Sequence, residues 1–143
     1  MTKILNWYRA SFAHSHTSGA IGLLILRLVF GLALAQHGFG KMQAPTSWMG
    51  PEAPVPGFFQ FLAAFSEFGG GIAWALGLLT PIASFGIIVT MVVAVFHHFT
   101  GGQPWVAPNG GGSFEPAMGY LVVGVFLLLN GPGPLSLDRK VFK

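Results

Sequence analysis

Four long apolar runs constrain the fold of this 143-residue chain more than any other feature. They cover roughly residues 19–40, 57–79, 80–99 and 114–130, and only 8% of all residues carry a formal charge. Soluble domains carry about 25% charged residues, whereas apolar helices of roughly 17–25 residues can cross a bilayer core. The pattern therefore predicts an all-α fold, a four-helix transmembrane bundle.

The connections between the runs fit this prediction. The segments KMQAPTSWMGPEAPVP and TGGQPWVAPNGGGS are rich in proline and glycine, so each should form a long loop. Between the second and third runs, Thr80-Pro81 resembles a helix N-cap followed by proline at the first helical position, which predicts a tight turn. After the fourth run, GPGP should end the last helix.

The first 18 residues form a separate arm in this interpretation. Ile4, Leu5, Tyr8 and Phe12 share one face of a helix, which predicts a short amphipathic helix lying in the membrane interface. A disordered arm is the alternative. The predicted organisation is an interfacial arm at 1–18, a membrane domain at 19–138 and a basic cytoplasmic tail at 139–143.

Five of the seven Lys and Arg residues lie at the two ends of the chain. Such a bias places both termini in the cytoplasm and the long loops outside, in a multi-pass protein of the inner (plasma) membrane. The net charge is only +3, and the basic residues form no stripe that would indicate nucleic-acid binding. The terminal basic residues are Lys3, Arg9, Arg139, Lys140 and Lys143.

Two charged residues fall deep within the apolar runs. Arg27 and Glu67 would each cost about 2.5–3.5 kcal/mol at mid-helix, so we expect them to form an ion pair inside the bundle. The pair could simply hold two helices in register, or Glu67 could handle protons or bind a ligand. Gly69, Ala73 and Gly77 recur every four residues and should let helices approach closely.

Further polar groups collect near the predicted outer face. His37 and Lys41 share a helix face, and His97, His98 and Glu115 lie at a similar depth. We expect them to line one pocket for an anionic or quinone-like head group, beneath loops that carry Trp48 and Trp105. Alternatively, they are ordinary interface residues that anchor helix ends.

Other cofactors are less favoured. Haem could lie between His37 and either His97 or His98, but no haem-attachment motif is present and no third ligand completes a zinc site. The chain has no cysteine, which excludes thiol–disulfide chemistry and thiolate-bound iron–sulfur clusters within it.

The segments LRLVFGLALAQHGFGK, EFGGGIAWALGLLTP, FHHF and EPAMGYLVVGVFLLLNGPGPLSLD together resemble the DoxX family over roughly residues 20–138. The resemblance implies a small four-helix membrane protein. The family name comes from subunits linked to quinol oxidase and to thiosulfate:quinone oxidoreductase, so the resemblance also implies a quinone-linked membrane subunit. The matching polar residues are Arg27, His37, Lys41, Glu67, His97 and Glu115.

The leading hypothesis is therefore a membrane subunit of an oxidoreductase system with quinone as its ligand, embedded in lipid and working with a partner protein or as a homo-oligomer. Glu67 and His37 are the predicted catalytic residues. The alternative is a non-enzymatic anchor or assembly subunit that recruits a partner, and a small-solute carrier ranks third. The predicted ligand-binding residues are Arg27, Lys41, His97, His98, Glu115, Trp48 and Trp105.

Overall fold

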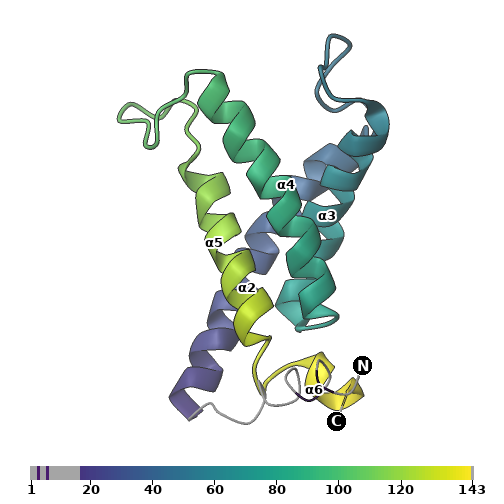
Figure 1. Ribbon diagram of the computed structural model, residues 1–143, viewed down its shortest axis with the longest axis vertical. Helices are drawn as coiled ribbons and strands as arrows, with labels where there is room; N and C mark the ends of the chain where they lie inside the picture. Colours follow the sequence, from purple (N-terminus) through teal and green to yellow (C-terminus); the bar gives the residue numbers. More distant parts are fainter. Residues whose placement is uncertain (1–2, 4–5, 7–16, 143) are drawn as a thin grey trace.

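The computed structural model describes Lys3, Asn6 and residues 17–142 (Figure 1). The predicted interfacial helix in the arm lies almost wholly outside these residues. The described part of the chain is all-α and contains no strand, which confirms the all-helical part of the predicted fold class. Its helices are α2 (Thr17–Met42), α3 (Gly57–Leu76), α4 (Thr80–Thr100), α5 (Glu115–Asn130) and the short α6 (Leu137–Val141).

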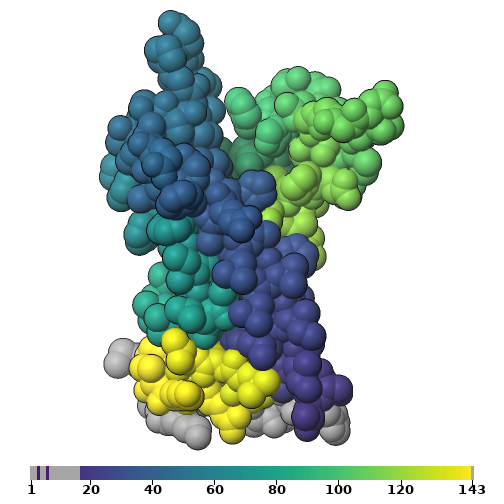
Figure 2. Space-filling model, turned by 180° about the vertical axis from the view of Figure 1, so that it is seen from behind, coloured from purple at the N-terminus to yellow at the C-terminus, as the bar shows by residue number. Residues whose placement is uncertain are grey.

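The four long helices form two antiparallel pairs. α2 packs along α3, and α4 packs along α5, while α3 and α4 join the pairs and α2 touches α5 over only a short stretch. The pairs separate toward the end that carries loops 43–56 and 101–114 (Figure 1). In the space-filling view, these loops and helix ends form two lobes with a notch between them (Figure 2). The fold is thus closed at one end and open at the other.

Glycines allow α2 and α3 to approach at backbone distance. A β-carbon on Gly38 would overlap the backbone of Phe68, and one on Gly71 would lie 2.6 Å from the amide nitrogen of Ala35. The predicted ridge of Gly69, Ala73 and Gly77 is therefore wrong at Gly69. Gly69 faces the ring of Phe65 in its own helix instead. The contact requires small residues on both helices.

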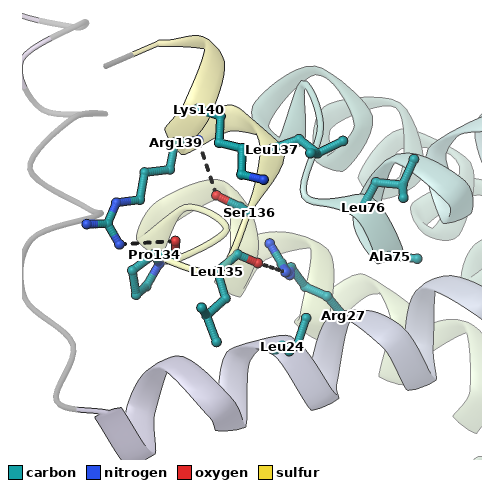
Figure 3. Close-up of a pocket in the computed structure, with 10 residues that line it drawn as sticks. All are labelled: Leu24, Arg27, Ala75, Leu76, Pro134, Leu135, Ser136, Leu137, Arg139 and Lys140. Atoms are coloured by element: carbon teal, nitrogen blue, oxygen red, sulfur yellow. Dashed lines mark hydrogen bonds between the residues drawn. The ribbon is translucent and has the colours of Figure 1, made fainter.

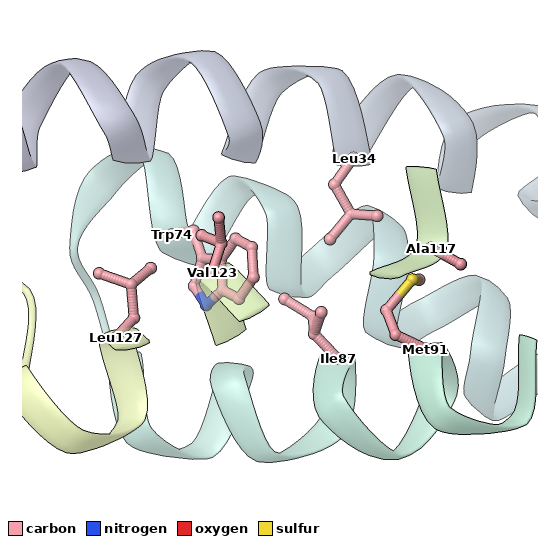
Figure 4. Packing of buried hydrophobic residues seen from close by; sticks show 7 residues of the cluster. All are labelled: Leu34, Trp74, Ile87, Met91, Ala117, Val123 and Leu127. Carbon is pink, nitrogen blue, oxygen red and sulfur yellow. The ribbon is translucent and has the colours of Figure 1, made fainter. Parts of the chain in front are cut away.

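A small apolar core lies where the two pairs meet (Figure 4). Trp74 of α3 is fully buried, and its indole Nε1 donates a 2.9 Å hydrogen bond to Ser84 Oγ of α4. This bond satisfies a polar group that would be costly to bury unpaired. The remaining buried members of the cluster are Leu34, Ile87, Met91, Ala117, Val123 and Leu127.

The outer surface of the helices suits lipid. α2 and α4 are both long and apolar enough to cross a membrane, and α5 is an apolar helix of shorter length. Large apolar side chains such as Val29, Phe85 and Phe96 point outward, with 60%, 63% and 69% of their surface exposed. Exposed apolar surface on this scale indicates contact with a bilayer.

The turn between α3 and α4 is fixed by the C-terminal segment. Asp138 accepts hydrogen bonds from the backbone nitrogens of Leu79 and Thr80, at 2.7 and 2.9 Å, and its own nitrogen donates to Gly77 O. Thr80 was predicted as the N-cap of α4, but Leu79 occupies that position in a left-handed conformation (φ 48°). A distant carboxylate therefore caps the helix in place of the local hydroxyl.

Candidate functional site

The buried carboxylate of Glu67 is paired with Lys41. The Lys41 Nζ lies 2.5 Å from Glu67 Oε1, and the side chains are 27% and 3% exposed. The same ammonium stands 4.4 Å from the centre of the Trp48 ring, within the range of a cation–π interaction. Glu67, Lys41 and Trp48 thus form one polar group at the open end of the α2–α3 pair.

The predicted ion pair between Arg27 and Glu67 is wrong. Arg27 is buried, but its Nη1 donates to Pro132 O at 2.9 Å and its Nη2 donates to Leu135 O at 2.5 Å. These carbonyls belong to the segment between α5 and α6, at the closed end of the fold. Arg27 therefore holds the C-terminal segment and does not belong to the Glu67 group.

The register of α2 and α3 explains this correction. Gly38 faces Glu67 and Phe68, whereas a β-carbon on Gly77 would overlap the guanidinium of Arg27. Eleven residues of helix separate positions 27 and 38, a rise of about 16 Å at 1.5 Å per residue. The prediction assumed that both helices end at the same depth, but α2 extends well beyond the end of α3.

His37 and Tyr120 meet where α2 touches α5. Their rings lie edge to face with centres 6.0 Å apart. The ring of Phe30 also packs edge to face with Tyr120, with ring centres 5.8 Å apart. His37 thus links Tyr120 to the part of α2 that carries Lys41, the partner of Glu67. Three helices therefore bring together His37, Lys41, Glu67 and Tyr120, which we call the Glu67 cluster.

One oxygen of the cluster is left for a ligand. Glu67 Oε2 is buried and has no hydrogen-bond partner among the residues that the structure describes. Buried polar atoms are nearly always hydrogen-bonded, so an unpaired carboxylate oxygen indicates a missing partner such as a ligand or water. His37, on the same part of α2 as Lys41, is exposed. The cluster can thus accept a proton or a hydrogen bond at Oε2 and donate one from Lys41.

The other predicted site residues lie on the second lobe. His97 and His98 end α4 with ring centres 5.8 Å apart, and Trp105 packs on Phe114, which precedes Glu115 at the start of α5. Among the described residues, no hydrogen bond, ion pair or ring contact joins them to the Glu67 cluster. The predicted single pocket beneath both tryptophans is therefore wrong, because the two helix pairs diverge (Figure 2).

Gln60 and Tyr120 are two residues that sequence reasoning missed. Gln60 is buried, and its side-chain Nε2 donates to Val55 O at 2.8 Å while its Oε1 accepts from Met49 N at 3.1 Å. Its backbone carbonyl accepts a hydrogen bond from Trp48 Nε1 at 3.0 Å. It therefore fixes the loop that sets Trp48 over Lys41. In both cases the available signal was a lone polar side chain within an apolar run.

Within the described ranges, no group of three His, Asp or Glu side chains could hold a metal ion. The site offers hydrogen-bond donors from Lys41 and His37 and an acceptor from the Glu67 carboxylate. Most residues of this site lie in a segment that is recognisable in other proteins. Residues 22–100, which contain His37, Lys41 and Glu67, match the sequence profile of DoxX.

This chain belongs to the DoxX family. An "Uncharacterized protein" of Haemophilus influenzae is 33% identical over 85% of this chain and 91% of its own length. The "Inner membrane protein YqjF" of Escherichia coli is 32% identical over 86% of this chain and 94% of its own length. A Bacillus subtilis protein named "Putative oxidoreductase CatD" is 29% identical over 86% and 89%. No solved structure matches this DoxX-family chain.

Proposed function

We propose that this DoxX-family protein is a four-helix transmembrane subunit of an oxidoreductase system, and that the Glu67 cluster binds the head group of a quinone or quinol. One relative is named as an oxidoreductase, and another as an inner membrane protein. By analogy, this chain resides in the inner membrane. The bias of basic residues toward the ends of the chain favours a topology with both termini in the cytoplasm.

The observation that carries this proposal is the unpartnered Oε2 of Glu67, buried beside the Lys41 ammonium. A quinol hydroxyl would donate a hydrogen bond to Oε2, and a quinone carbonyl would accept one from Lys41. His37 and Tyr120 would contact the ring from the side of α5. The isoprenoid tail would lie on the apolar surface of the helices, which already suits lipid.

The cluster also offers a path for protons. Oxidation of a quinol to a quinone releases two protons and two electrons. Glu67 would accept the first proton, and exposed His37 would pass protons to water, since imidazole exchanges protons near neutral pH. The two electrons would go to a redox partner protein in the same system. Arg27, His97, His98, Glu115 and Trp105 have no part in this site.

Fluorescence quenching by a short-chain quinone tests the proposal. Decylubiquinone and its reduced form, decylubiquinol, would each be titrated into the full-length protein in detergent, with Trp48 as the reporter and Trp48→Phe to identify its share of the signal. Loss of a hydrogen bond to a charged group should weaken binding of the reduced form about tenfold in Glu67→Gln. Glu52→Gln, a change at an exposed loop carboxylate, is the matched control.

Failure of the test has a clear meaning. If the parent protein shows no saturable quenching, or if Glu67→Gln and Glu52→Gln bind equally, the quinone site is wrong. A partner protein that co-purifies unchanged with Glu67→Gln would then favour the anchor or assembly subunit. Mass spectrometry of lipids extracted after gentle purification gives an independent readout, because a natural quinone should be present in the parent and depleted in Glu67→Gln.

A further inference from the structure

A basic pocket lies at the closed end of the fold, away from the Glu67 cluster (Figure 3). It has a volume of about 500 Å³ and is bounded by α2, the end of α3 and the C-terminal segment. Arg27, Arg139 and Lys140 contribute its three cationic side chains. None of the described residues that line it is acidic, so the pocket has a strong positive potential.

Two of these cations are available to a ligand. Arg139 Nη1 donates to Pro134 O at 3.2 Å, and its backbone nitrogen donates to Ser136 Oγ at 3.3 Å, which fixes its position (Figure 3). Neither Arg139 nor Lys140 forms an ion pair with the described residues. The nearby carboxylate of Asp138 is directed at the N-terminus of α4 instead. Carbonyl partners orient Arg139 without cancelling its charge.

The remaining walls of the pocket are apolar and continue onto the lipid-facing surface. Leu24, Leu76 and Leu135 line it, and Leu76 and Leu135 are each 48% exposed. Ile21 and Ile25 extend this surface along α2, one of the helices suited to cross a membrane. A pocket that is cationic at one side and apolar at the other matches a molecule with an anionic head and hydrocarbon chains.

We propose that this pocket binds an anionic phospholipid. The phosphate binds at the basic side of the pocket, which Arg139 and Lys140 line, and the acyl chains follow the apolar surface of α2 and α3. Basic residues beside membrane helices attract anionic lipids, and basic pockets between helices bind their head groups. The lipid would also hold the segment between α5 and α6 against α2, next to the contacts of Arg27 with Pro132 and Leu135.

Native mass spectrometry of the full-length protein in detergent tests this proposal. Phosphatidylglycerol would be titrated against the parent and against Arg139→Gln/Lys140→Gln, with phosphatidylcholine as the zwitterionic comparison. Two basic residues near a charged lipid contribute about 1 kcal/mol each, so the double variant should bind phosphatidylglycerol about thirtyfold more weakly. Lys3→Gln/Lys143→Gln removes the same charge from the chain ends and should change affinity less than threefold.

Several results would overturn the site. Equal weakening by Lys3→Gln/Lys143→Gln would mean general charge attraction, and equal affinity for phosphatidylcholine would mean that the phosphate head group is not recognised. Displacement of the lipid by millimolar inorganic phosphate would assign the site to a free anion. If the double variant does not fold, Lys140→Glu replaces it, because Lys140 is exposed and its side chain forms no hydrogen bond with the described residues. This variant should weaken phosphatidylglycerol binding at least as strongly.

Discussion

The carboxylate of Asp138 caps α4 from the far end of the chain, with Oδ2 2.9 Å from the backbone nitrogen of Thr80. Its Oδ1 accepts from Leu79 N at 2.7 Å, so one side chain satisfies two N–H groups at a helix start. The negative charge also interacts favourably with the helix dipole. The C-terminal segment is therefore part of the fold of the membrane helices.

Replacement of this cap should destabilise the protein. Asp138→Ala leaves two N–H groups unpaired, one of them buried, and should lower the free energy of unfolding by about 2 kcal/mol. Asp138→Asn keeps one acceptor oxygen and should lower it by about half as much. Denaturant unfolding in detergent micelles measures both, with Glu52→Ala at an exposed position as the control. Equal stability of Asp138→Ala and the parent would show that the cap contributes nothing.

The close approach of α2 and α3 predicts a strict size limit at Gly38. A β-carbon there would overlap the backbone of Phe68, and backbone cannot move aside as a side chain can. Gly38→Ala should therefore cost about 1–3 kcal/mol of stability by overpacking. Gly40→Ala, two residues further along, meets no atom within 4 Å and should be neutral or slightly stabilising. Thermal unfolding midpoints of the two variants provide the comparison, and equal midpoints would contradict the size limit at Gly38.

The pair of Lys41 and Glu67 should be strongly coupled. Lys41→Met leaves a carboxylate that is only 3% exposed without its cation, which should cost about 3 kcal/mol. Adding Glu67→Gln removes that buried charge and should recover more than 1 kcal/mol of the loss. A double-mutant cycle on unfolding free energies gives the coupling directly. Additive losses would mean that the two side chains act independently.

The hydrogen bond between Trp74 and Ser84 predicts a fourth stability effect. Ser84→Ala leaves the indole N–H in a dry core, where an unpaired donor costs about 1–3 kcal/mol. Changing Trp74→Phe in the same background removes the donor, so the double variant should lose less than the two single losses summed. Unfolding midpoints provide the comparison, and Ser47→Ala on the exposed loop is the control.

The helices could be predicted because hydropathy and proline are local signals. The predicted run that began near Gly57 and the one that ended at Asn130 match α3 and α5 closely. The small residues that let α2 and α3 approach were not all predicted correctly, since Gly71 and Gly38 make the contact and Gly69 does not. Which glycine faces a neighbour depends on how the helices are rotated, and the sequence pattern does not specify that rotation.

The site was predicted less well because it depends on register. Glu67 was correctly selected as the buried carboxylate, but its partner is Lys41 and not Arg27. The depth of a residue within its own helix does not reveal how far the adjacent helix extends. Asp138 illustrates the same limit, since its carboxylate reaches Thr80 across 58 positions of sequence. Contacts of this kind follow from the assembled bundle.

The junction at Leu79 sets the angle between α3 and α4. Since α4 has 21 residues and rises about 1.5 Å per residue, it is roughly 30 Å long. A rotation of about 10° at this junction would move the far tip of α4 by roughly 5 Å relative to α3. The hydrogen bonds of Asp138 to Leu79, Thr80 and Gly77 therefore control how far the loop end of α4 lies from α3.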